Sequence, residues 1–285
     1  MLAMTKIPYP PQRPLSVGEI LDLTFQIYRA TLIRCLVFSA LGVLAGQLTN
    51  VYGLAKGHRM GGGWQGFLQA LQGQQGDPTY WLLFLAEVVL TIVFSAAVLL
   101  RQHALIADRA VGGEVTVGLR RTPAMIGLGI LLLLSAALCF LPALLVGGLT
   151  RYAVALLLLI PLSYILVALS CAYVVLLVED AGPLASYLRS WRLTGGSFWR
   201  LSLIYTVGLI VLLVMILIVS VVAGFLAGVL GRGDVVLTAA ATGVTVIALG
   251  AITTPFQTAI TLAVFGDLTA RKEGADIEQR ISATV

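Results

Sequence analysis

The chain has 285 residues, of which 59% are hydrophobic and only 11% are charged, a balance that excludes an ordinary soluble domain. Its formal net charge of +5 accompanies long apolar stretches, so we expect the basic residues to orient the chain and attract anionic lipid, with no nucleic-acid partner. The three cysteines and two histidines form no ligand-spaced cluster, which predicts no metal, no cofactor and no disulfide.

Six apolar stretches are long enough to cross a bilayer, which takes about 20 residues per helix. They lie at about 33–54, 80–100, 124–149, 152–178, 201–230 and 235–266. We therefore predict an all-α polytopic membrane protein, a bundle of six transmembrane helices with interfacial amphipathic helices on its cytoplasmic face. An extended lead-in at 1–14 precedes the membrane domain at 15–270, and a tail follows at 271–285.

The lysines and arginines orient this bundle. Of the 18 in the chain, 14 fall before or at the start of span 1, between spans 2 and 3, between spans 4 and 5, and in the tail. Cytoplasmic segments carry the excess of basic residues in membrane proteins, so both termini are expected in the cytoplasm. The expected location is therefore the inner (plasma) membrane.

The first predicted element is a surface helix at 15–31, just after a proline-rich lead-in. Ser16 and Glu19 have the spacing of a capping box, which starts a helix. Four polar residues then share one helical face, which suits a helix at the cytoplasmic interface: Glu19, Asp22, Gln26 and Arg29. The alternative is a continuous extension of span 1 beyond the membrane.

Similar segments precede spans 3 and 5. At 183–194 an apolar stripe faces two arginines; the stripe is Leu184, Tyr187, Leu188 and Trp191, and the arginines are Arg189 and Arg192. The pairs Gly18-Glu19, Gly113-Glu114 and Gly182-Pro183 would then begin three equivalent units, each with a surface helix and a membrane hairpin. Any six-span protein divides into three hairpins, so the units can equally be unrelated.

Glu87 is the one clear ionisable residue well inside a span, roughly 10 Å from its outer end at the rise of an α-helix. A charge at this depth is costly and normally has a partner or a water-filled cavity. Glu87 is therefore either a proton or cation site, or a structural carboxylate that is neutral or paired with a basic group such as Arg151.

Small residues and prolines mark the other spans. Two small-residue stripes allow close helix packing, within the bundle or between copies in a homo-oligomer: Gly42 with Gly46, and Ser220 with Gly224 and Gly228. Pro142, Pro161 and Pro255 interrupt spans 3, 4 and 6, which is common in membrane helices and also builds transporter sites. The sequence has none of the motifs that we sought for phosphate-binding loops, nucleophile elbows or zinc proteases, so no catalytic residue is assigned.

Three stretches together resemble one bacterial family. They are Arg13-Pro14-Leu15-Ser16-Val17-Gly18-Glu19-Ile20-Leu21-Asp22, with Phe25 and Tyr28-Arg29 after it; Glu179-Asp180-Ala181-Gly182-Pro183-Leu184, with Ser190-Trp191-Arg192-Leu193-Thr194-Gly195-Gly196-Ser197-Phe198-Trp199-Arg200; and Asp267-Leu268-Thr269-Ala270-Arg271-Lys272-Glu273-Gly274-Ala275-Asp276. The family is named for the membrane domain of glycerophosphoryl diester phosphodiesterases. One departure is Gly266, where the pattern has an aromatic residue directly before the aspartate.

The resemblance implies a six-helix membrane module without the soluble catalytic barrel of the name-giving enzymes. The matching residues lie mostly at cytoplasmic span ends, which suits docking or structural roles; they include Glu19, Asp22, Arg29, Asp180, Trp191, Arg192, Asp267, Arg271 and Lys272. We expect a non-enzymatic module that organises a partner protein or lipid at this face. The alternative is a small transporter or channel for a lipid-like or other small substrate, built on Glu87 and the proline-containing spans.

Overall fold

The computed structural model describes residues 9–11, 13–56, 77–148, 150–231 and 235–284. These residues form helices and short connections, with no strand among them, which confirms the all-α prediction. Six helical segments are long and apolar enough to cross a membrane. They are Val17–Gly53, Pro78–Ile106, Glu114–Ala143, Tyr152–Val178, Phe198–Phe225 and Gly243–Lys272.

The first hairpin comprises α1 (Val17–Ala45), the short α2 (Leu48–Ala55) and α4 (Pro78–Ile106). Ser16 caps α1 in the predicted capping box: its backbone N–H donates to Glu19 Oε2 at 2.7 Å, and its hydroxyl accepts from Glu19 N at 3.3 Å. Asp77 caps α4 by accepting from Thr79 N at 3.0 Å, and Pro78 occupies the first helical position, where no N–H is needed.

The separate surface helix predicted at 15–31 is wrong, because α1 runs without a break from the capping box into span 1. Its buried residues recur every three or four positions over the whole length, so one face packs continuously. They are Ile20, Leu23, Thr24, Ile27, Thr31, Cys35, Ser39, Gly42 and Ala45. This arrangement is the alternative that the sequence left open, a continuous extension of span 1.

The second hairpin comprises α5 (Glu114–Leu145), α6 (Thr150–Ala168) and α7 (Ala172–Val178). Here too the predicted surface segment before span 3 continues directly into the span. The helices run through Pro142 and Pro161, so the spans are not broken at these prolines. The interruption in span 4 instead lies at 169–171, between α6 and α7.

The third unit comprises α8 (Pro183–Thr194), α9 (Phe198–Gly231) and α10 (Val235–Thr284), which continues through Pro255. Only here is the surface helix separate, with the predicted bounds, because Gly195 ends it and Gly196 adopts a left-handed conformation (φ 80°). The three predicted starting pairs thus lie where α1, α5 and α8 begin.

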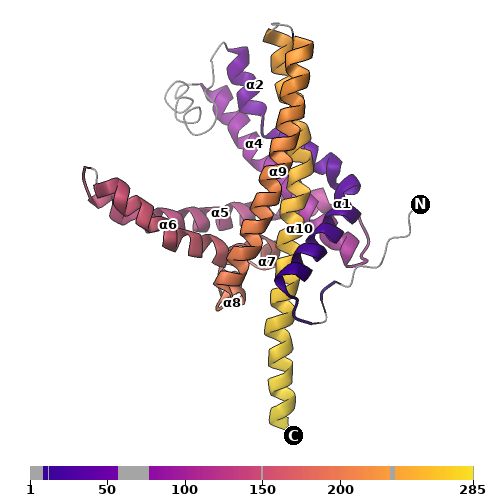
Figure 1. The fold of residues 1–285 in the computed structure, drawn as a ribbon, viewed down its shortest axis with the longest axis vertical. Helices are drawn as coiled ribbons and strands as arrows, with labels where there is room; N and C mark the ends of the chain where they lie inside the picture. Colours follow the sequence, from indigo (N-terminus) through magenta and orange to yellow (C-terminus); the bar gives the residue numbers. More distant parts are fainter. Residues whose placement is uncertain (1–8, 12, 57–76, 149, 232–234, 285) are drawn as a thin grey trace.

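The three units diverge from one region of the molecule, beyond which the C-terminal part of α10 continues (Figure 1). We call it the terminal end, because Leu15 and Asp267, near the two termini, are in contact there. The main hydrophobic core lies in this region. It joins the start of α1, the second half of α4, the first half of α5, α7, the end of α8, the start of α9 and residues 259–268 of α10. Farther out, the α5–α6 hairpin and α9 expose leucines, as expected for surfaces that face lipid.

Candidate functional site

Glu87 points into the bundle and binds the start of a neighbouring helix. Its Oε2 accepts hydrogen bonds from Thr49 N at 3.0 Å and from Thr49 Oγ1 at 2.6 Å. Thr49 is the second residue of α2, where backbone N–H groups have no partner within the helix. The carboxylate therefore caps α2 and fixes it to α4, which is a structural use of the residue. The side chain of Arg151, considered as its partner, lies outside the described part.

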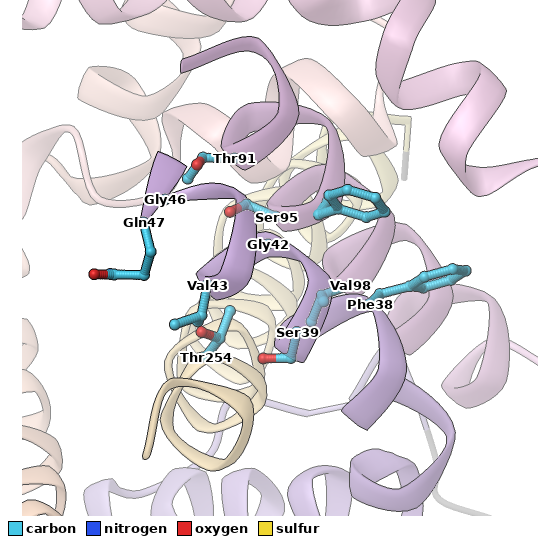
Figure 2. Close-up of a pocket in the computed structure, with 11 residues that line it drawn as sticks. Phe38, Ser39, Gly42, Val43, Gly46, Gln47, Thr91, Ser95, Val98 and Thr254 are labelled. Carbon is cyan, nitrogen blue, oxygen red and sulfur yellow. The ribbon is translucent and has the colours of Figure 1, made fainter. Parts of the chain in front are cut away.

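A small pocket of about 170 Å³ lies one helical turn farther along α4 (Figure 2). It is lined by Gly42 of α1 and by Gly46 just after that helix, by Thr91 and Ser95 of α4, and by Thr254 of α10. The Thr91 hydroxyl is buried without a hydrogen-bond partner in the described structure. Glu87 is not among the lining residues, so this pocket does not form around the intramembrane carboxylate.

The two small-residue stripes have different surroundings. A Cβ on Gly42 would lie 3.1 Å from Phe94 Cβ, so this glycine allows α1 to pack closely on α4. Ser220 and Gly224 of α9 are exposed, and no atom would contact a Cβ on Gly224. The second stripe therefore does not pack within the described bundle, while the surroundings of Gly228 lie outside the described residues.

Gln102 is a buried polar residue that the sequence prediction missed, because span 2 was ended at residue 100. Its amide Nε2 donates to Thr31 Oγ1 at 3.0 Å and to the Pro255 carbonyl at 2.9 Å. Its Oε1 accepts from the Thr258 hydroxyl at 2.5 Å. One fully buried amide thus joins α1, α4 and α10 with its hydrogen bonds satisfied. The sequence signal that could have identified this residue is an uncharged amide within an apolar helix.

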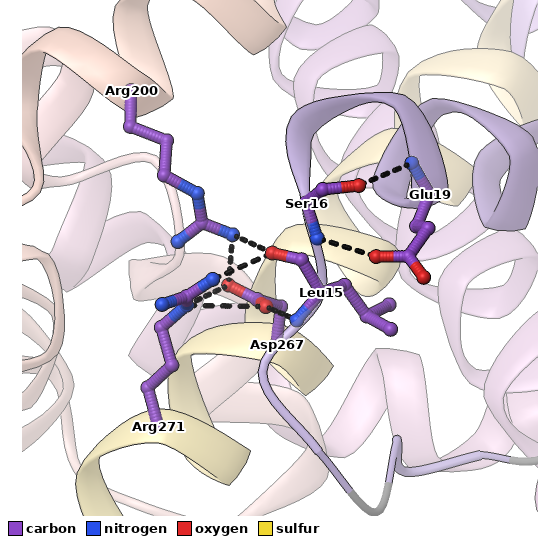
Figure 3. Close-up of polar contacts among 6 residues, drawn as sticks. All are labelled: Leu15, Ser16, Glu19, Arg200, Asp267 and Arg271. Atoms are coloured by element: carbon purple, nitrogen blue, oxygen red, sulfur yellow. Dashed lines mark hydrogen bonds and ion pairs between the residues drawn. The ribbon is translucent and has the colours of Figure 1, made fainter.

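Asp267 forms the centre of the most highly connected polar site (Figure 3). Its side chain is 0% exposed and accepts from Leu15 N at 2.7 Å, Arg200 Nη2 at 2.6 Å and Arg271 Nε at 3.1 Å. The Leu15 carbonyl accepts from Arg200 Nη2 at 2.9 Å and from Arg271 Nη2 at 2.5 Å. We call the Leu15 backbone, Arg200, Asp267 and Arg271 the Asp267 cluster.

The electrostatics of the Asp267 cluster follow from burial. A buried carboxylate is costly unless charged hydrogen-bond donors surround it, and here two guanidiniums and one backbone N–H do so. Both arginines also bind the Leu15 carbonyl, so each is held at two points. The cluster therefore ties the start of the chain to the first turn of α9 and to α10.

The segment before Leu15 packs along α10 as well. Burial raises the pKa of the Tyr9 hydroxyl, which stays protonated and donates to the Leu262 carbonyl at 3.2 Å. A Cβ on Gly266 would lie 2.9 Å from Tyr9 Cε2 and 3.0 Å from Pro11 Cδ. The glycine that departs from the family pattern is thus required for this contact.

The other motif residues form a second set of contacts at the terminal end. Asp180 forms an ion pair with Arg121 of α5, and Glu179 forms one with Arg189 at 3.3 Å. Lys272 Nζ donates to the Gly195 carbonyl at 3.2 Å, which joins α10 to the end of α8. The three stretches that carry the family resemblance therefore meet in space, although they are far apart in the chain.

Several predicted site residues remain at the surface. Glu19 pairs with the exposed Arg13 at 2.5 Å. Asp22, Arg29 and Arg192 are exposed, and Trp191 packs edge-on against Tyr164 with ring centroids 5.6 Å apart. These residues are outside the Asp267 cluster.

The buried face of α8 is polar, which the sequence did not reveal. Ser190 and Thr194 donate to the Ala168 carbonyl at 2.8 and 3.0 Å. Ala168 is the last residue of α6, so the two hydroxyls satisfy a carbonyl at a helix end. The exposed face carries Leu184, Leu188 and Trp191. This orientation leaves the apolar stripe of α8 free to face lipid.

Within the described residues no group of three potential metal ligands occurs. No family model matches the chain, and no curated protein or solved structure has significant similarity to it. The resemblance to the phosphodiesterase membrane-domain family thus stays a prediction that rests on the three motifs.

Proposed function

We propose that the chain is a non-enzymatic module of the bacterial inner membrane that organises a partner protein or a lipid at its cytoplasmic face. The terminal end would face the cytoplasm, in keeping with the excess of basic residues in the segments assigned to that side. The observation that carries the proposal is the convergence of the three family-like stretches at the Asp267 cluster and its neighbouring contacts.

The placement of packing supports this proposal. The core and the buried charges lie at the terminal end, whereas the parts of α5, α6 and α9 far from it expose apolar side chains. A rigid end on diverging membrane hairpins suits a docking or assembly role, because the shape of its polar surface is held by buried interactions. Glu87 supports the same proposal, since its carboxylate is already engaged by Thr49.

Transport of a small substrate is the second candidate. It is favoured by the pocket beside α4, whose Thr91 hydroxyl is buried without a partner and available to a ligand. The proposal of a module predicts no proton-coupled flux through the protein reconstituted in vesicles that contain a pH-sensitive dye. Flux that Glu87→Gln abolishes while the protein stays folded would favour the transporter instead.

Photo-crosslinking in intact membranes tests the docking role directly. A photoreactive residue would replace the exposed Asp22 or Arg192 at the terminal end, and Val51 at the opposite end as the matched control. We expect one discrete protein or lipid adduct from the terminal-end positions and none from Val51. Adducts from Val51 alone would contradict the proposed docking face.

A further inference from the structure

The side chains in and beside the Asp267 cluster carry more positive than negative charge. Arg200 and Arg271 share one carboxylate, and Lys272 lies next in the chain with its amine on the Gly195 carbonyl. Together with Asp267, these side chains therefore carry three positive charges and one negative charge. The nearby Arg13–Glu19 pair is neutral as a whole and does not remove the excess.

Both arginines also keep a terminal nitrogen available. Arg200 forms its hydrogen bonds through Nη2, and Arg271 forms its own through Nε and Nη2. In the described structure the two Nη1 atoms make no hydrogen bond, and neither is among the buried atoms that lack a partner, so neither is fully buried. Their side chains are 21% and 35% exposed.

The two free nitrogens point the same way. In Figure 3 the unused ends of both guanidiniums lie on the side away from Leu15 and Glu19. The arginines are close together, because Nη2 atoms of both contact the Leu15 carbonyl. Two adjacent guanidinium groups with free N–H donors match the oxygens of a phosphate group, and their shared contacts hold them in place before it binds.

The position in the spans identifies the source of the phosphate. Arg200 is the third residue of the apolar segment Phe198–Phe225, and Lys272 is the last residue of Gly243–Lys272. The neighbouring Trp199 is 84% exposed, as is typical of an aromatic residue at the level of the lipid headgroups. A phosphate bound here lies where the headgroup of a membrane lipid lies, with an apolar surface beside it.

We infer that Arg200, Arg271 and Lys272 form a binding site for the phosphate group of an anionic membrane phospholipid. This inference rests on the proposed function, of which it names the lipid partner. The site would hold one headgroup at the joint between the N-terminal segment, α9 and α10. Lipid bound there would reinforce the same contacts that hold the three units together.

Quenching of tryptophan fluorescence tests the inference. The protein would carry Trp199 as its only tryptophan and would be reconstituted with brominated phosphatidylglycerol or brominated phosphatidylcholine. We expect phosphatidylglycerol to bind near Trp199 with the higher affinity, and Lys272→Gln to lower that preference about tenfold, as for the loss of one charge-assisted hydrogen bond to the phosphate. Arg271→Gln should lower the preference at least as much, provided that the variant remains folded.

Arg120→Gln is the matched control, because Arg120 is an exposed arginine of α5 outside the cluster. It removes the same charge and should leave the preference unchanged. A loss equal to that of Lys272→Gln would show diffuse surface attraction and overturn the site, as would an unchanged preference in both cluster variants. Displacement of phosphatidylglycerol by excess inorganic phosphate would assign the site to a free anion instead.

The outcome is separable from that of the proposed function. Proton-coupled flux in the vesicle assay would contradict the proposed function as a module. The preference for phosphatidylglycerol would still be measured separately by tryptophan quenching. Absence of both flux and headgroup preference would retain the module and remove the lipid as its partner at this site.

Discussion

At the scale of single residues, Asp267 is the side chain on which most of the terminal end depends. Its burial is tolerated only because Arg200, Arg271 and the Leu15 N–H surround it. The exposed Asp22, also an aspartate of a family-like motif, makes no such contact in the described part of the chain. The two residues therefore allow a direct comparison.

Asp267→Asn should destabilise the protein by about 1–3 kcal/mol, because Arg200 and Arg271, whose side chains are 21% and 35% exposed, lose the charge that balances them. Asp22→Asn should change stability by less than about 0.5 kcal/mol, since its side chain is exposed. Denaturation in detergent micelles measures both. Equal stabilities for the two variants would show that the Asp267 cluster contributes little to folding.

Glu87 is predicted to matter as a helix cap. Glu87→Ala should cost about 0.5–2 kcal/mol, the usual range for loss of a capping group. Glu87→Gln should cost less, because the amide oxygen accepts the same two bonds from Thr49. Thermal unfolding in detergent measures these changes, with the exposed Leu85→Ala on the same helix as the control. A Gln variant less stable than the Ala variant would contradict the capping role.

Gly266 is predicted to tolerate no side chain. Gly266→Ala would place a Cβ within 3.0 Å of Tyr9 and Pro11, and overpacking of this kind costs about 1–3 kcal/mol. The N-terminal segment should then be cleaved faster by a protease added to the purified protein. Gly18→Ala is the control, because nothing lies within 4 Å of its added Cβ, and it should be neutral or stabilising. Unchanged cleavage of Gly266→Ala would contradict the close contact.

At the scale of elements, the contrast between α1 and α8 is informative. Both begin where a surface helix was predicted, yet α1 continues into its span and α8 ends at Gly195-Gly196. The signals that start these two helices could be recognised in the sequence, because they act over three or four residues. The continuity of α1 depends on the stripe from Ile20 to Ala45 that packs along α4 and α10, which is a tertiary property.

We predict that α8 lies along the membrane surface. Spin labels at positions 183–194 should show accessibility to oxygen that varies with a period of about 3.6 residues. Labels at 184 and 188 should be most exposed to lipid, and those at 189 and 192 most exposed to water. The buried Leu193 provides a control position that is shielded from both lipid and water. A uniform profile along α8 would rule out this orientation.

At the scale of the whole molecule, the three hairpins diverge from one packed end. Each hairpin contributes buried residues to the core at that end, and the apolar surfaces of α5, α6 and α9 farther out suit lipid. This arrangement makes the orientation in the membrane decisive, because it determines which compartment the Asp267 cluster faces.

We predict that the terminal end faces the cytoplasm. In a cysteine-free background, an impermeant thiol reagent applied to intact cells should label a cysteine at position 62 and leave one at position 275 unlabelled. Permeabilised cells provide the control, since both positions should then react. Labelling of position 275 with protection of position 62 would reverse the predicted topology.

The sequence by itself determined the six apolar helices, their helix-starting signals and the bounds of α8, because hydrophobic length and capping are local properties. The tertiary structure alone decided which charges are buried. Asp267 binds Leu15, 252 positions away, and Arg200, 67 positions away, and no local pattern separates it from an exposed aspartate such as Asp22. The same holds for Gly266 and Gln102, whose roles come from Tyr9, Thr31 and Thr258 on distant parts of the chain. Partners that meet only through packing of the helices decide the energy of a buried polar group, so its role becomes visible only in the folded molecule.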